Sequence, residues 1–156
     1  MENYSKNLIQ EGKKKLGWVA LEKPNGLYLG EADYLVPNGR GLFLFNKDGL
    51  AWVGYFNDGV KGDQGRLFDR RGNLLYEGSY QNGIRNGNGT FYYPDGSKYE
   101  GEFVNGLREG KGVFSWNDGT YWDGTFKNNE MDGTGNFFDG EEAYEVTYKE
   151  GDLVDE

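Results

Sequence analysis

Few side chains in this sequence are suited to catalysis, and none has the neighbours that a catalytic motif needs. The chain has no histidine and no cysteine, which removes the commonest general base, the thiol nucleophile and the usual zinc ligands. None of the four serines lies in a Gly-x-Ser-x-Gly motif. Glu100 and Asp123 could form a carboxylate pair, but acidic residues recur at such positions, which favours a solvated acidic row. We therefore expect no enzyme activity and no cofactor.

The glycine-rich segments also lack the residues that bind phosphate or metal. The segment from Gly83 to Gly89 has no Gly-Lys-Ser/Thr, and no helix is expected after it to receive a phosphate. Gly110-Lys111-Gly112 lacks the same features. The Asp-Gly turns do not fit the Asp-x-Asp-x-Asp-Gly calcium loop. The sequence thus predicts no nucleotide site and no metal site.

The sequence repeats an aromatic residue, a glycine two residues later and a second aromatic residue two residues after that. Clear examples are Trp52-Gly54-Phe56, Tyr76-Gly78-Tyr80, Tyr99-Gly101-Phe103 and Trp122-Gly124-Phe126. Another glycine follows 13 residues after each starting aromatic, as Gly112 follows Tyr99. We count six repeats and a half repeat within one predicted domain, residues 1–156, with starts near 4, 28, 52, 76, 99, 122 and 144. A fixed period of this length is typical of a repeat architecture.

Each repeat has the pattern of a β-hairpin. Its two segments alternate with period two, which places every second residue on the same face of a strand. Asn82-Gly83 and Asn105-Gly106 separate the segments within repeats, and Asp95-Gly96 separates one repeat from the next. Asn, Asp and Gly supply the positive φ that tight turns need. The 27 glycines argue against a helix, so the chain is predicted to be all-β.

The segments YEGSYQNGIRNGNGTFYYPDGS at 76–97 and YEGEFVNGLREGKGVFSWNDGT at 99–120 resemble the MORN repeat. The resemblance covers about residues 28–148. It implies a single-layer, elongated, twisted antiparallel sheet of consecutive MORN-type hairpins. MORN repeats accompany lipid kinases, junctional membrane proteins and a lysine methyltransferase, and both phospholipid binding and protein–protein or dimer contacts have been suggested for them. The resemblance therefore implies the fold and leaves the function open.

Composition limits the location and the partners. The N-terminus lacks the apolar stretch of a signal peptide, and no segment has the length of a membrane span, so a cytoplasmic protein is expected. Residues 1–78 carry 11 basic and 10 acidic residues, whereas residues 79–156 carry 6 and 16. An acidic half repels nucleic acid and anionic lipid. We therefore predict no nucleic-acid partner, and the net charge of −9 disfavours membrane lipid.

Face A is our name for the face of the predicted sheet that holds the starting aromatics, such as Tyr76 with Gly78 and Tyr80 on the first strand and Phe91 on the second. A glycine has no Cβ, so a neighbouring ring can lie flat on the backbone. We predict that this aromatic stripe is the core, because large apolar side chains are mostly buried. The alternative is an aromatic groove for an extended peptide.

Face B, the opposite face, is polar or acidic in the C-terminal half, as at Glu77, Glu100 and Glu102, but apolar in the N-terminal half. The repeat does not require apolar residues there, and such a patch exceeds what monomers usually expose. The chain ends, through Leu8, Ile9, Leu153 and Val154, could cover it, or it could be a partner or homodimer interface. The predicted partner-binding residues are Trp18, Leu29, Leu42, Leu44, Val53, Tyr55 and Phe68.

We therefore predict a non-catalytic interaction or scaffold module that presents an apolar and aromatic sheet surface to a protein partner or to another copy of itself. One variant is an acidic inhibitor that masks a basic partner with residues 77–156. Another is head-to-tail association of the basic first repeat with the acidic last one. The alternative function is peripheral binding to phospholipid through Lys13, Lys14 and Lys15, which is a thin basis at about 1 kcal/mol for each lysine. The identity of the partner and the oligomeric state stay open.

Overall fold

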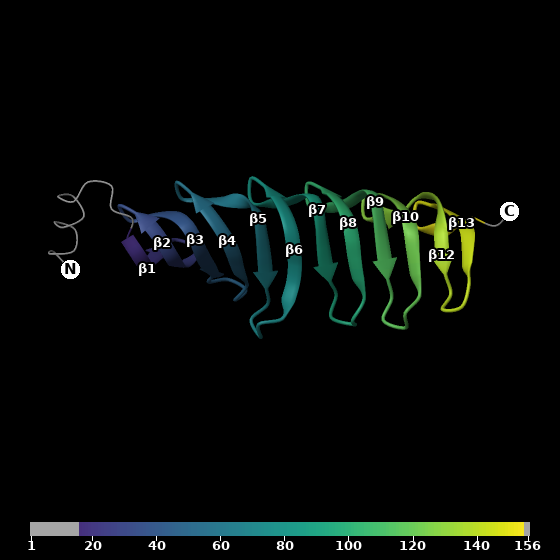
Figure 1. The fold of residues 1–156 in the computed structure, drawn as a ribbon, viewed down its shortest axis with the longest axis horizontal. Helices are drawn as coiled ribbons and strands as arrows, with labels where there is room; N and C mark the ends of the chain where they lie inside the picture. Colours follow the sequence, from purple (N-terminus) through teal and green to yellow (C-terminus); the bar gives the residue numbers. More distant parts are fainter. Residues whose placement is uncertain (1–15, 155–156) are drawn as a thin grey trace. The chain divides into compact units, whose positions relative to one another are not determined.

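The structure of this protein, a computed structural model, describes residues 16–154. Within this range the chain forms fourteen β-strands and no helix. The strands fall into two compact units, an N-terminal unit that ends at Asn73 and a C-terminal unit that begins at Leu74. In each unit the strands neighbour one another in chain order (Figure 1), except that β10 pairs with both β11 and β12, and all the pairings are antiparallel. The prediction of an all-β fold made of consecutive antiparallel hairpins is confirmed.

The strand bounds follow the predicted repeats. The N-terminal unit contains β1 (Leu16–Lys23), β2 (Gly26–Asp33), β3 (Val36–Phe45), β4 (Ala51–Asn57) and β5 (Val60–Phe68). The C-terminal unit contains β6 (Leu74–Gln81), β7 (Ile84–Tyr92), β8 (Lys98–Val104), β9 (Leu107–Ser115), β10 (Tyr121–Lys127), β11 (Glu130–Met131), β12 (Gly133–Phe138), β13 (Ala143–Lys149) and β14 (Asp152–Leu153). Strands β2 and β3 are thus the hairpin of the repeat from Tyr28, and β8 and β9 that of the repeat from Tyr99. That all of residues 1–156 form one domain stays a prediction.

The turns have the residues that their backbone angles require. In the turn between β8 and β9, Asn105 and Gly106 have φ values of 49° and 82°. Both lie in the left-handed region that favours Asn-Gly in two-residue hairpins. In the turns between repeats an aspartate accepts a hydrogen bond from the backbone two residues later, as in Thr120 N to Asp118 Oδ1 at 2.9 Å. The sequence places both kinds of turn correctly.

Five of the starting aromatics form the core, as predicted, whereas Tyr144, the start of the half repeat, is 47% exposed. Tyr28, Trp52, Tyr76, Tyr99 and Trp122 are at most 1% exposed. The Tyr99 ring lies on Gly112, where an added Cβ would stand 2.4 Å from its Cε2 atom. The hydroxyl of Tyr99 donates a hydrogen bond to the carbonyl of Glu102 at 2.7 Å. At Tyr99 a single sheet thus excludes water from a large ring by laying it flat on a glycine and by giving its hydroxyl a hydrogen-bond acceptor.

Edge-to-face ring contacts join one repeat to the next. Tyr99 contacts Phe103 of its own repeat at 5.1 Å between ring centroids and Phe126 of the following repeat at 4.8 Å. Trp122 continues the series to Phe126 at 5.2 Å and Tyr148 at 5.3 Å. Such pairs contribute about 0.5–1.5 kcal/mol each beyond the area they bury. A repeat therefore needs its neighbour to complete the packing of its own rings.

A β-bulge that the sequence analysis does not predict recurs in these hairpins. Gly101 lies opposite Gly112 and Phe103 opposite Arg108, so two residues along β8 span four along β9. Gly110 lies in the bulge with φ 84°. The Glu102 carboxylate accepts a hydrogen bond from the Lys111 backbone amide at 2.6 Å. Glu102, assigned above to a solvated acidic face, is exposed but also completes the bulge.

Strand β1 pairs in a different register from the later strands. In later repeats the glycine 13 residues after the start lies opposite the next repeat's first glycine, as Gly41 lies opposite Gly54. In β1 the residue opposite Gly30 is Val19, two residues beyond Gly17. The connection between Lys23 and Gly26, which pair directly, is shorter than the turns between later repeats. The start of the first repeat, Tyr4, lies outside the described residues.

Candidate interaction surface

Four apolar side chains form a row across face B of the N-terminal unit. Leu29 on β2 lies directly opposite Ala20 on β1 and Leu42 on β3, and Leu42 lies opposite Val53 on β4. Side chains that are directly opposite in an antiparallel pair are separated by about 5 Å and contact one another. The register therefore brings three of the predicted partner-binding residues together in one continuous row.

A second apolar row lies beside the first. Leu27 on β2 pairs with Leu44 on β3, Leu44 with Ala51 on β4, and Ala51 with Phe68 on β5. Leu44 and Phe68 are among the predicted partner-binding residues, whereas Leu27 and Ala51, which occupy the positions just before the starting aromatics, are not. The apolar patch, as we call the two rows together, consists of Ala20, Leu27, Leu29, Leu42, Leu44, Ala51, Val53 and Phe68.

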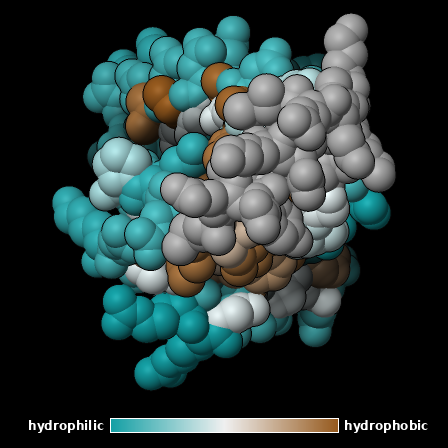
Figure 2. All heavy atoms as spheres, turned by 90° about the vertical axis from the view of Figure 1, so that its left-hand side faces the viewer, coloured by the Kyte–Doolittle hydropathy of each residue, from teal (hydrophilic) through white to brown (hydrophobic). Residues whose placement is uncertain are grey.

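Trp18 and Tyr55, also predicted to bind the partner, flank the apolar patch on the same face. Trp18 lies opposite Glu31, and Tyr55 lies opposite Arg40. Their side chains are 65% and 58% exposed, and Leu44 is 40% exposed. Figure 2, seen from the side of β1, shows hydrophobic residues in brown at the surface among hydrophilic residues in teal. Two large rings thus stand open to solvent beside half-buried aliphatic side chains.

The chain ends were considered above as a cover for this patch. Leu8 and Ile9 lie outside the described residues. Leu153 and Val154 are themselves 55% and 43% exposed. The patch is therefore a candidate for contact with a second molecule.

The same repeat positions are mostly polar in the C-terminal unit. Leu29 and Val53 correspond to Glu77, Glu100 and Asp123, the residues that directly follow a starting aromatic. The residues that correspond to Leu42 are Thr90, Val113 and Asn136. Thr90 lies opposite Glu100 and Val113 opposite Asp123, so this row alternates acidic and small side chains. The first apolar row is thus a property of the N-terminal unit, whereas the positions of the second row in the C-terminal unit include Tyr121 and Phe138, which lie opposite one another with stacked rings.

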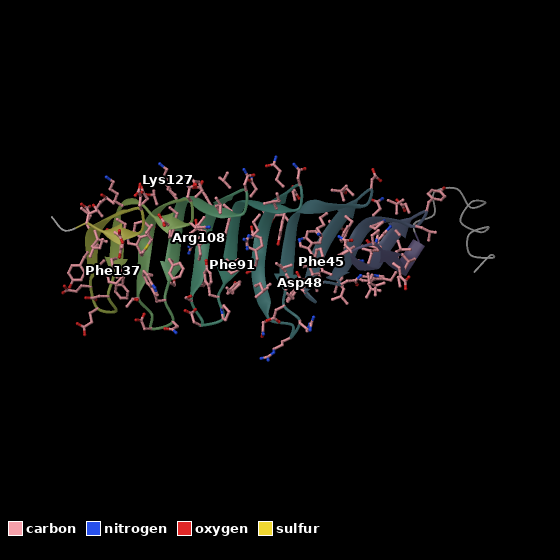
Figure 3. All side chains as sticks on the ribbon, turned by 180° about the vertical axis from the view of Figure 1, so that it is seen from behind. Phe45, Asp48, Phe91, Arg108, Lys127 and Phe137 are labelled. Carbon is pink, nitrogen blue, oxygen red and sulfur yellow. The ribbon has the colours of Figure 1, made fainter. Side chains whose placement is uncertain are left out.

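Face A carries a second surface that the sequence analysis does not identify. The guanidinium carbon of Arg85 lies 4.8 Å from the ring centroid of Phe91 and 5.6 Å from that of Phe103. That of Arg108 lies 5.7 Å from the ring centroids of both Phe114 and Phe126. Figure 3 labels Arg108 among the side chains of the C-terminal unit, with Phe91 and Phe137. Cations therefore cover the aromatic stripe at successive repeats.

Lys61 occupies the corresponding place in the N-terminal unit. Its Nζ atom lies 4.4 Å from the ring centroid of Phe45. Burial against these rings lowers the pKa of Lys61 from its ordinary value. The sequence signal for this position is its place nine residues after each starting aromatic, which holds Pro37, Lys61, Arg85, Arg108, Met131 and Leu153.

A cavity of about 300 Å³ opens beside Arg108 in the C-terminal unit. Phe114, Trp116 and Phe126 supply its aromatic walls. Its other lining residues are Arg108, Asn129, Glu130, Met131 and Gly151. The cavity is therefore mainly apolar, with one cation and one carboxylate among its lining side chains.

Residues 16–154 contain no group of three or more His, Cys, Asp or Glu side chains placed to hold a metal ion. Nor does any helix there have the length and apolar character needed to cross a membrane.

Comparison with known families agrees with the repeat pattern of the C-terminal unit. Residues 76–98, 99–121 and 122–140 match the family model of the MORN repeat as three consecutive copies. No curated protein matches the chain in sequence. The three matched segments coincide with the hairpins that begin at Tyr76, Tyr99 and Trp122.

Proposed function

We propose that this MORN-repeat protein is a non-catalytic interaction module that binds a protein partner through the apolar patch of its N-terminal unit. MORN repeats are generally found in proteins that bind other proteins or membranes. The absence of histidine and cysteine from the whole chain supports a role without catalysis. Binding, not chemistry, is therefore the function that the surface serves.

One observation carries this proposal: two adjacent apolar rows occupy positions that the hairpin repeat leaves free. In the C-terminal unit, which has the same hairpin fold, the positions of the first row hold the opposed pairs Thr90–Glu100 and Val113–Asp123. Full burial of one leucine side chain stabilises a complex by roughly 1.5–3 kcal/mol. The exposed rings of Trp18 and Tyr55 are of the types that most often dominate binding energy at interfaces. A partner that covers the two rows and both rings would gain binding free energy from the burial of each.

The experiment uses a matched pair of substitutions at one repeat position. Leu42→Glu introduces a charge in the apolar patch, and Val113→Glu introduces the same charge at the corresponding position of the C-terminal unit. Both side chains are half-buried. The tagged full chain and the two variants are used to retrieve partners from cells, with quantification of each retained protein, and are also sized by light scattering.

We expect the wild type and Val113→Glu to retain the same partner protein at the same molar ratio to the tagged chain, and we expect Leu42→Glu to lose it. A wild-type dimer that only Leu42→Glu dissociates would identify a second copy as the partner. Equal retention and equal mass for all three proteins would contradict the proposal. Circular dichroism of each variant shows whether the fold is kept.

Peripheral membrane binding is the second candidate, because membrane binding is the other general role of MORN repeats. The net charge of −9 opposes it, and the lysines at 13–15 lie outside the described residues. Salt distinguishes the two functions, since attraction of lysines to anionic lipid is screened whereas apolar contact is not. Vesicle binding that disappears at high salt and survives Leu42→Glu would favour the membrane over the apolar patch.

A further inference from the structure

Three residues at one repeat position form a column across face A of the C-terminal unit. Arg85, Arg108 and Met131 each lie nine residues after a starting aromatic, on β7, β9 and β11. Between β7 and β9 there is one strand, β8, and between β9 and β11 there is β10. Two strand spacings are about 10 Å. The column therefore presents cation, cation and thioether at steps of about 10 Å.

Both guanidinium groups of the column keep hydrogen-bond donors for a ligand. Arg85 Nη2 donates to the carbonyl of Gly106 at 3.2 Å, and Arg108 Nη2 donates to that of Asn129 at 2.5 Å. A guanidinium has five N–H donors, so these bonds hold each group in place and leave others unused. Neither the Arg40–Glu31 pair nor the Lys98–Glu100 pair of residues 16–154 involves Arg85 or Arg108. The two cations thus lie on rings, and Glu130 lines the same cavity as Arg108.

The third position of the column, Met131, is apolar. Met131 lines the 300 Å³ cavity together with Phe114, Trp116 and Phe126. Glu130 also lines it, and its charge disfavours a carboxylate at this step. An aliphatic or aromatic side chain of a ligand matches this lining better than an acidic one.

We propose that the column binds a peptide in the polyproline II conformation that carries two acidic residues and one apolar residue at every third position. Polyproline II has three residues per turn and a rise of about 3.1 Å per residue, so every third side chain returns to the same side after about 9.3 Å. That period matches the step of about 10 Å along the column. A β-strand does not fit, because its side chains alternate with period two.

The rings beneath the column support this choice of ligand. Polyproline II segments dock in grooves lined by aromatic side chains, where their preformed backbone loses little entropy on binding. Phe91, Tyr93, Phe114, Trp116 and Phe137 are half-buried and supply such a lining. Tyr93 contacts Phe114 at 5.6 Å and Trp116 contacts Phe137 at 5.9 Å, so the lining is continuous from β7 to β12. Recognition of acidic residues depends on local contact with the two arginines, since the net charge of −9 opposes an acidic ligand at long range.

The test measures binding of a fluorescent peptide, Glu-Pro-Pro-Glu-Pro-Pro-Leu, to the full chain by anisotropy. We expect at least tenfold weaker binding for Arg108→Gln and for a peptide with glutamine in place of both glutamates. Lys111, three residues after Arg108, is exposed on face B, so Lys111→Gln removes one positive charge there and should leave binding unchanged. Inserting a third proline between the two glutamates should also weaken binding, because the period no longer fits.

Met131→Arg gives a second arm that does not depend on loss of function. It adds a third cation to the column, so the variant should bind a peptide with glutamate in place of the final leucine more tightly than the peptide that ends in leucine. Failure of the wild type to bind the peptide, or equal binding by Arg108→Gln and Lys111→Gln, would overturn the proposal. Binding to phosphatidylserine vesicles that depends on Arg108, without peptide binding, would overturn it in favour of lipid. Leu42→Glu should not affect peptide binding, so this proposal and the proposed function can fail separately.

Discussion

The N-terminal and C-terminal units each have a core of the same kind on face A, but they differ on face B. In both, a starting aromatic lies flat on a glycine, as Tyr28 lies on Gly41 and Tyr99 on Gly112. In both, a glutamate completes the bulge, with Glu31 accepting from the Arg40 amide at 2.7 Å and Glu102 from the Lys111 amide at 2.6 Å. On face B, Leu42 and Val53 lie opposite one another in the first unit, whereas Val113 and Asp123 do so in the second.

This difference separates what the repeat requires from what it permits. Face A is fixed by packing, because each ring needs a glycine beneath it and a second ring against its edge. Face B contributes little to that packing, so its residues can vary with function. A departure from the polar pattern on face B is therefore more informative about function than any residue that follows the repeat.

The largest expected effect is the loss of a core ring in either unit. Tyr28→Ala and Tyr99→Ala each remove a fully buried ring, so each should lower the free energy of unfolding by about 3–5 kcal/mol. Trp18→Ala removes a larger ring that is 65% exposed and should cost much less. Urea denaturation monitored by fluorescence and circular dichroism measures all three. If either Tyr28→Ala or Tyr99→Ala lowered the free energy of unfolding only slightly, the two cores would not be equivalent.

The glycines beneath the rings give the next effect. An added Cβ at Gly41 or Gly112 would lie 2.4 Å from a ring carbon of Tyr28 or Tyr99. Gly41→Ala and Gly112→Ala should therefore each destabilise the fold by about 1–3 kcal/mol through overpacking. Gly17→Ala is the matched control, because a Cβ there meets no atom within 4 Å. Equal thermal stability of all three variants would contradict the account of why glycine recurs.

The bulge carboxylates give a smaller effect. Glu102→Ala removes the acceptor of the Lys111 amide, and Glu31→Ala removes that of the Arg40 amide. Each should cost about 1–2 kcal/mol for the lost hydrogen bond to a carboxylate, and Glu31→Ala also removes the exposed ion pair with the Arg40 side chain. Glu100→Ala, which breaks only the exposed pair with Lys98, should change the stability by less than about 1 kcal/mol. Chemical denaturation of the three variants distinguishes a structural carboxylate from a solvated one.

Acid sensitivity is the smallest expected effect. Hydrogen bonds from the side chain and backbone of Thr120 hold the pKa of Asp118 below its ordinary value. A carboxyl group whose pKa is lower in the folded state stabilises the fold above its unfolded pKa of about 3.9, and that contribution is lost as pH falls through the folded value. Asp118→Asn keeps an acceptor for the turn but does not titrate. Its urea midpoint should therefore fall less than that of the wild type between pH 7 and about pH 2.5.

Turn aspartates of this kind are distributed unequally between the two units. Turn aspartates with lowered pKa include Asp95, Asp118 and Asp139 in the C-terminal unit and Asp69 in the N-terminal unit. The loss of stability between pH 7 and pH 3 should therefore be larger in the C-terminal unit. Amide hydrogen exchange at the two pH values, corrected for the intrinsic exchange rates, measures this, and a larger loss of protection in β2 to β4 than in β8 to β10 would contradict it.

The sequence predicts the parts of the fold that depend on local pattern. The aromatic and glycine spacing predicts the hairpins, and Asn105-Gly106 predicts the position of a turn, because each depends only on neighbouring residues. The bulge at Gly110 and the role of Glu102 depend on which residues face each other across strands, and spacing alone does not determine that. The shifted register of β1 has the same origin, since it follows from the short connection between Lys23 and Gly26.

The candidate surfaces are predictable to different degrees. Alternation in the sequence places Leu29, Leu42 and Val53 on one face, and the register adds that they are direct neighbours. The cations of face A are harder to find, because Arg85 and Arg108 are ordinary residues in an ordinary strand. Only their common distance from a starting aromatic marks them, and only the structure places them on the rings.

The most direct test of the central claim, that the apolar patch of the N-terminal unit is the partner-binding surface, is site-specific cross-linking in cells. A photoreactive amino acid is placed at Leu44, which is 40% exposed, or at Ser115, the corresponding position of the C-terminal unit. The account predicts a discrete cross-linked product, to a partner or to a second copy, from position 44 and none from position 115. The same product from both positions, or a product from position 115 alone, would contradict it.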